Sequence, residues 1–128
     1  MKTSDGIGKV ISAARIKARP ENRRELCMTI SALLDPIRHE EGCRTYTFYG
    51  EVEDQNSLML IGEWDNFAAW DNHLNSEHFA VLIGSLLLLT SRSDLDFRLL
   101  SGVAGIEALA GARVEQSMEV SQSSMAIG

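Results

Sequence analysis

The stretch "CRTYTFYGEVEDQNSLMLIGEW", residues 43–64, predicts two β-strands that pair with each other. Residues 43–53 are rich in β-branched and aromatic residues, which favour strands, and a second apolar run fills residues 57–64. The polar turn "EDQN", residues 53–56, is short enough to make the two strands antiparallel neighbours. Both strands carry apolar or aromatic side chains on both faces, which predicts a sheet that is covered on both sides.

The segments before this hairpin predict a strand followed by a helix. Residues 9–19 alternate loosely in polarity, as a strand does. Pro20 and Glu21 suit the first turn of a helix, Pro36 is expected to kink or end it, and Gly42 closes the segment. Apolar residues at helical spacing form one stripe along this helix: Leu26, Ile30, Leu33, Leu34 and Ile37.

Two shorter helices are expected after the hairpin. Asp65 is a candidate cap for a helix that runs through Leu74, and Ser76 is a candidate cap for a second helix that runs through Leu88. Residues 79–90 are strongly apolar, but the run is only about half as long as a membrane span. We therefore expect a buried helix there and no membrane anchor.

The last predicted strand completes the fold. Residues 94–100 alternate in polarity, with Leu95, Phe97 and Leu99 expected to point inward. The order strand, helix, strand, strand, helix, strand predicts an α+β ferredoxin-like βαββαβ sandwich with an antiparallel sheet. We expect this domain to span residues 1–101, and residues 102–128 to form a tail that becomes ordered only when it packs on something.

Composition and charge restrict the partners. The 128 residues include eighteen acidic and twelve basic ones, a net charge of −6, which makes nucleic acid or an anionic membrane surface an unfavourable partner. A small molecule or another protein fits better. Cys27 and Cys43 are expected to be free thiols in a reducing cytoplasm. Residues 1–10 have no apolar core, so we do not expect them to act as a signal peptide. Two helices cover only one sheet face, so we also expect a homodimer that pairs the other faces.

Two motifs resemble a known family. The pattern G-C-R-x-Y at residues 42–46, and "EWDNFAAWDNHLNSEHF" at residues 63–79, resemble the antibiotic biosynthesis monooxygenase domain. This domain belongs to the dimeric α/β-barrel group, which includes quinol monooxygenases, and the resemblance extends over residues 9 to about 100. It implies oxidation of an electron-rich phenol, quinol or polyketide-like polycyclic aromatic by molecular oxygen, with no metal or flavin cofactor.

Such a reaction needs a base to deprotonate the substrate, donors for the developing oxyanion, and a dry pocket. His73 is the candidate base, because an imidazole titrates near neutral pH. Trp64 is expected to offer its indole N–H, and Asn72 or Asn66 an amide donor. The aromatic walls of the pocket are expected from Tyr46, Phe48, Phe67 and Phe79. Tyr46 and Tyr49 point to opposite faces of their strand, so only one of these two tyrosines can line the pocket.

Other chemistry is less well supported by the residues. His73 and His78 are five positions apart, which on one continuous helix directs them about 140° from each other, so no metal site is expected. Ile83 stands where the haem-degrading members of the family would carry a histidine. Glu77 is four residues from His73, but the intervening residues are expected to break the helix. Cys43 is read as a small buried residue, not as a nucleophile.

Two further functions remain open at this point. An isomerase of a small oxygenated metabolite would need a polar pocket rich in histidine and serine. A non-catalytic, small-molecule-binding dimer module would be favoured if His73 were fully packed, with no cavity beside it.

Overall fold

The structure is a computed structural model that describes residues 9–101. It confirms the α+β ferredoxin-like fold, with four strands in one antiparallel sheet of order β2-β3-β1-β4. The predicted tail, residues 102–128, lies outside the described residues. The elements are β1 (Val10–Lys17), η1 (Pro20–Asn22), α2 (Arg23–Arg38), β2 (Cys43–Gly50), β3 (Ser57–Trp64), α3 (Phe67–Leu74), α4 (Glu77–Leu89), η2 (Arg92–Asp94) and β4 (Leu95–Ser101).

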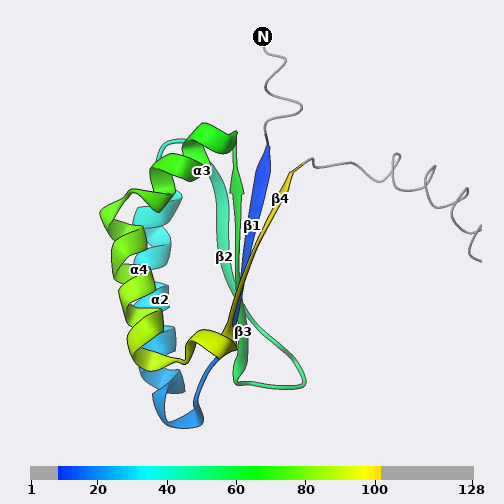
Figure 1. Cartoon of the computed structure of the whole chain (residues 1–128), viewed down its shortest axis with the longest axis vertical. Helices are drawn as coiled ribbons and strands as arrows, with labels where there is room; N and C mark the ends of the chain where they lie inside the picture. Colours follow the sequence, from blue (N-terminus) through cyan, green and yellow to red (C-terminus); the bar gives the residue numbers. More distant parts are fainter. Residues whose placement is uncertain (1–8, 102–128) are drawn as a thin grey trace, which may run out of the picture.

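The helices α2, α3 and α4 lie on one side of the sheet (Figure 1). Alternate residues of β1 and β3 point toward them and are buried, as the period of two in a strand requires. Burial of a single leucine or isoleucine side chain stabilises the fold by about 1.5–3 kcal/mol. The most deeply buried apolar side chains make up the centre of this core: Ile16, Leu26, Ile30, Ile37, Leu60, Trp64, Leu82 and Leu86.

The structure refines two predicted details of the first helix. Pro20 begins a short 3₁₀ turn, and α2 itself begins only at Arg23. Of the two effects expected of Pro36, an end of the helix is not observed, since α2 continues to Arg38 and the amide of His39 still reaches the carbonyl of Asp35 at 3.3 Å. The expected kink stays a prediction. A proline so close to the helix end removes only one hydrogen bond of the last turns, so the helix tolerates it.

The helix caps agree with the prediction at one site and not at the other. The Ser76 hydroxyl accepts a hydrogen bond from the amide of Phe79 at 3.2 Å, as expected for the cap of α4. Asp65, however, does not cap α3; the Asn66 side chain does, at 2.8 Å from the amide of Ala69. The carboxylate of Asp65 instead pairs with Arg44 at 2.9 Å. The start of α3 is therefore one residue later than predicted.

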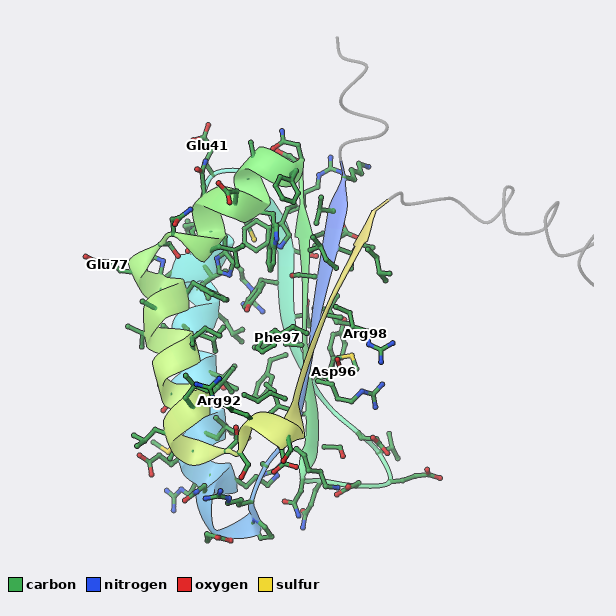
Figure 2. The ribbon with its side chains drawn as sticks, in the orientation of Figure 1. Glu41, Glu77, Arg92, Asp96, Phe97 and Arg98 are labelled. Atoms are coloured by element: carbon green, nitrogen blue, oxygen red, sulfur yellow. The ribbon has the colours of Figure 1, made fainter. Side chains whose placement is uncertain are left out.

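The edge strand β4 leaves apolar side chains partly open on the helix side. Phe97 and Leu99 pair with Ala14 and Ser12 of β1, and Figure 2 shows Phe97 directed toward the helices while Arg98 points to the other face. Their inward direction was predicted, yet Phe97 is 48% exposed and Leu99 is 45% exposed. The reason is that β4 pairs only with β1 and forms the rim of the sheet.

The other face of the sheet is bare in the part of the chain that the structure describes (Figure 1). Apolar side chains from all four strands lie on it, as the register shows: Ile11, Ala13, Tyr49, Met59, Ile61 and Leu100. Within residues 9–101, no helix has the length and apolar character needed to cross a bilayer.

Candidate active site

His73 lies in an aromatic cage at the end of α3. Its ring stacks on that of Trp64, with ring centroids 4.5 Å apart and an interplanar angle of 29°. Phe79 approaches it edge-on at 5.1 Å, and the Tyr46 ring lies at 5.8 Å. The imidazole side chain is 1% exposed. A polar ring in such surroundings needs hydrogen-bond partners, or it would be costly to bury.

The partner of His73 is Glu40, in the turn between α2 and β2. The Nδ1 atom of His73 is 2.7 Å from one oxygen of Glu40, and Nδ1 of His78 is 2.8 Å from the other. An ionised carboxylate only accepts hydrogen bonds, so both Nδ1 atoms carry their proton and donate it. In its neutral form, His73 therefore has an unprotonated Nε2.

The Nε2 atom of His73 has no hydrogen-bond partner among residues 9–101. The same residues contain no fully buried side-chain nitrogen or oxygen without a partner. Since His73 also lines a cavity, we infer that Nε2 is open to that cavity. Burial lowers the pKa of His73 below its ordinary value of 6.5, and the charge of His78 lowers this pKa further. The hydrogen bond and the charge of Glu40 act in the opposite direction, but burial has the larger effect. The imidazole is thus neutral at neutral pH, as a base must be.

The cavity beside His73 has a volume of about 110 Å³. An engineered protein cavity of about 150 Å³ binds benzene, so a space of this size suits one aromatic ring. It lies between the β1–β4 side of the sheet and the helices α3 and α4. On the helix side of the sheet its lining is mainly apolar and aromatic: Ser12, Ala14, Tyr46, Leu60, Trp70, His73, Phe79, Leu82, Phe97 and Leu99.

Two hydroxyl-bearing residues line this cavity from β1 and β2, the two strands that flank β3. Ser12 and Tyr46 lie in one row across the sheet, with Gly62 between them, and all three are on the helix side. The Ser12 oxygen accepts a hydrogen bond from Nε1 of Trp64 at 3.2 Å, which leaves its own proton free to donate. Burial raises the pKa of the Tyr46 phenol, so that it stays protonated and can donate as well.

Gly62 makes this arrangement possible. A Cβ atom at this position would lie 2.8 Å from Cδ1 of Tyr46, 2.9 Å from Oγ of Ser12 and 2.9 Å from Nε1 of Trp64. These distances are too short for real Cβ contacts. The absence of a side chain therefore lets the two hydroxyl-bearing residues and the tryptophan approach one another.

Three predicted site residues meet at the cavity: Tyr46, His73 and Phe79. Of the two tyrosines, Tyr46 faces the cavity, while Tyr49 lies on the opposite sheet face. Phe48 packs against the core on the helix side, but it does not line the cavity.

The other predicted residues lie elsewhere. Trp64 is fully buried behind His73, and its N–H is already bound to Ser12, so it supports the site without offering a donor to a substrate. Phe67 begins α3 and is 60% exposed, outside the cavity lining. Asn66 and Asn72 border a separate hollow next to Gly42. Because a helix turns about 100° per residue, the presence of His73 on the inner face directs Asn72 away from it.

Sequence reasoning did not identify Glu40, Ser12, Trp70 or Leu82. Glu40 is 33 residues from His73, so no local spacing could connect them. Ser12 did carry a signal, because it is the polar member of the buried alternating set in β1. The carboxylate that binds His73 is thus Glu40 and not Glu77, in agreement with the expected break of the helix between His73 and Glu77.

The thiol and metal chemistry of the described residues is limited. Cys27 and Cys43 are free cysteines, as predicted. Burial raises the pKa of the Cys43 thiol to about 11, which keeps it protonated and unreactive at neutral pH. Among residues 9–101, no group of three or more histidine, cysteine, aspartate or glutamate side chains is placed to hold a metal ion.

Comparison with known proteins finds a family and several relatives. The family model described as "Antibiotic biosynthesis monooxygenase" matches residues 9–83, more than half of the chain. The chain is 36% identical over 66 residues to "Putative monooxygenase Rv0793" of Mycobacterium tuberculosis, covering 52% of this chain and 64% of that protein. It is 31% identical over 70 residues to "Uncharacterized protein sll1783" of Synechocystis, covering 55% of this chain and 48% of that one. The matched region thus spans less than two thirds of either relative.

A solved structure agrees with the fold. The solved structure of Rv0793 from Mycobacterium tuberculosis superposes with a TM-score of 0.70 and 27% sequence identity. The superposition covers 76% of this chain and 97% of the mycobacterial one.

Proposed function

Since the chain belongs to the antibiotic biosynthesis monooxygenase family, we propose that it is a monooxygenase that oxidises a single-ring phenol or quinol with molecular oxygen. The family and the monooxygenase name of its mycobacterial relative support a monooxygenase-like function. The observation that carries the finer proposal is the position of His73: a neutral, oriented imidazole beside an apolar cavity the size of one ring.

In this proposal, Nε2 of His73 removes the proton of the substrate hydroxyl. The anion gives up an electron to oxygen far more readily than the neutral phenol does, so deprotonation is the step that the protein must accelerate. A positioned general base typically contributes about 10²- to 10⁴-fold to such a step. The hydroxyls of Ser12 and Tyr46 are placed to donate to the developing oxyanion, in a site that the apolar lining keeps dry.

The proposed reaction uses no metal and no organic cofactor, with molecular oxygen as the co-substrate. The volume of about 110 Å³ supports this, because one substrate ring would fill the cavity. A polycyclic substrate would have to extend through the rim formed by Phe97 and Leu99, which are both partly exposed.

The competing functions have less support from the lining. An isomerase of a polar metabolite would be served by several polar groups, whereas most of the lining residues are apolar or aromatic. A fully packed His73 with no cavity beside it would favour a non-catalytic module, but a cavity does adjoin His73. Both observations favour the oxygenase.

We also propose a homodimer in which the bare sheet faces pack together. The apolar residues Met59 and Ile61 lie at the centre of that face, on β3, and Tyr49 is exposed beside them. Apolar side chains gathered on an uncovered sheet face are seldom left in water, and two-fold symmetry covers both copies with one contact.

The direct test of the reaction is oxygen uptake by the metal-free protein. The panel contains single-ring hydroquinones, naphthohydroquinones and anthrones, each corrected for autoxidation. We expect uptake that is proportional to protein, survives a chelator and is largest for the single-ring substrates. A rate no higher than autoxidation across the panel would contradict the oxygenase. Uptake only with the anthrones would contradict the single-ring assignment.

A further inference from the structure

We propose that Glu40 is the positioning residue of His73, and that His78 competes with His73 for the single charge of Glu40. The buried base would then be tuned by a partly exposed histidine that does not line the cavity. The catalytic consequence rests on the function proposed above. The coupling between the two histidines does not, because it is a property of the protein without substrate.

Three elements bring these groups together. Glu40 follows α2, His73 is the last but one residue of α3, and His78 is the second residue of α4. On one continuous helix, two residues five positions apart would diverge by about 140°. The chain avoids this because α3 ends at Leu74 and Ser76 caps a new helix, so that both histidines reach the same carboxylate.

The hydrogen bonds decide where a further proton can bind. Both Nδ1 atoms donate to Glu40, so each histidine can take up a proton only at Nε2. For His73 this atom faces the cavity. The His78 side chain is 41% exposed, against 14% for Glu40, so the His78 ring is open to solvent while Glu40 is largely screened from it.

One ionised carboxylate can neutralise one imidazolium. When His78 is protonated, Glu40 is already paired with a positive charge, and a second proton on His73 meets repulsion. When His78 is neutral, the full charge of Glu40 is available to stabilise a proton on His73. Protonation of the two histidines is therefore anticooperative.

The other ionisable groups packed around the cluster do not replace Glu40. On β2, burial raises the pKa of both Cys43 and Tyr46, so these two stay neutral. Arg38 of α2 donates through Nε to the carbonyl of Tyr46 at 2.8 Å. Figure 2 shows that Glu41 and Glu77 point away from the fold, toward solvent.

The test is an NMR titration of the histidine ring nitrogens in the full chain without substrate. In the wild type, both His73 and His78 should be protonated at Nδ1 when neutral. In His78→Gln, the titration midpoint of His73 should move to higher pH. Glu40→Gln can keep the hydrogen bond to His73 but loses the charge, so in this variant the titration midpoint of His73 should move to lower pH. The matched controls, His39→Gln and Glu41→Gln, alter exposed residues and should leave it unchanged.

Two results would overturn the proposal. One is a neutral His73 protonated at Nε2 in the wild type. The other is an unmoved His73 midpoint in His78→Gln, a variant of a partly exposed residue that should fold even if Glu40→Gln does not.

Oxygen uptake separates this proposal from the proposed function. For a substrate that the wild type oxidises, His78→Gln should move the acidic limb of kcat/KM to higher pH, since a stronger base needs a higher pH to be free. Glu40→Gln should lower kcat by about tenfold or more, with little change in KM. NMR shifts in a protein that takes up no oxygen would contradict the function alone. Uptake with no NMR shift would contradict the coupling alone.

Discussion

Replacement of Gly62 by alanine tests the packing that holds the site together. The added methyl group would lie within 3.0 Å of atoms from Ser12, Tyr46 and Trp64 at once. All three neighbours are buried, so none can move freely into solvent. Overpacking of a well-filled core costs about 1–3 kcal/mol, and we expect Gly62→Ala to fall in this range.

A loss of this size is easy to measure. One kcal/mol shifts the Tm of a domain of about 60–100 residues by roughly 4–8 °C. Urea unfolding should show a lower midpoint with an unchanged slope. The reaction should also slow, because the hydroxyls of Ser12 and Tyr46 are displaced from the cavity.

Gly84→Ala is the matched control. Gly84 lies in α4, where an added Cβ would meet no atom within 4 Å. In an exposed helix position, alanine is more favourable than glycine by about 0.5–1 kcal/mol, so this variant should be slightly stabilised. If Gly62→Ala were as stable as Gly84→Ala, the reasoning about the Ser12–Gly62–Tyr46 row would be refuted.

Three further predictions concern pH, assembly and the helix cap. Burial lowers the pKa of His73 below 6.5, so the stability gained by burying the neutral ring is fully present above pH 6.5 and is lost as pH falls through the lowered value. Urea midpoints should drop more steeply with acid in the wild type than in His73→Gln, and parallel curves would contradict this. Ile61→Glu places a charge on the bare sheet face and should give a monomer by light scattering. The control Leu88→Glu, on the exposed side of α4, should leave the dimer intact. If both variants were dimers, the proposed sheet contact would be wrong. Asn66→Ala should lower the free energy of unfolding by about 1 kcal/mol, because the α3 cap is lost. Asn72→Ala should leave oxygen uptake unchanged, because Asn72 borders a separate hollow. A large loss of uptake in Asn72→Ala would show that its amide takes part in the reaction.

The fold could be predicted from local patterns because each element carries its own signal. The β2–β3 hairpin follows from its composition and short turn, and the apolar stripe of α2 gives the face that packs on the sheet. The inward residues of β4 were also predicted from alternation. Their partial exposure was not, because it depends on which strand forms the rim of the sheet.

The site could be predicted only in part. His73 and Tyr46 were found because their residue types suit the chemistry and their positions fall at a strand and a helix near Trp64. Glu40 was missed because its contact with His73 crosses from one end of α2 to α3, and no spacing along the chain reports it. Asn72 was misplaced because it is next to His73 on α3, where consecutive side chains diverge by about 100°. Phe67 was misplaced because it begins α3 on the exposed side of the helix.

Oxygen uptake by His73→Ala tests the central claim most directly, using a hydroquinone that the wild type oxidises, with His39→Ala as the control. The proposed mechanism predicts that uptake by His73→Ala falls by about 10²-fold or more, that the variant keeps the size of the wild-type assembly, and that His39→Ala is unaffected. Wild-type rates in a folded His73→Ala protein would show that this histidine is not the base.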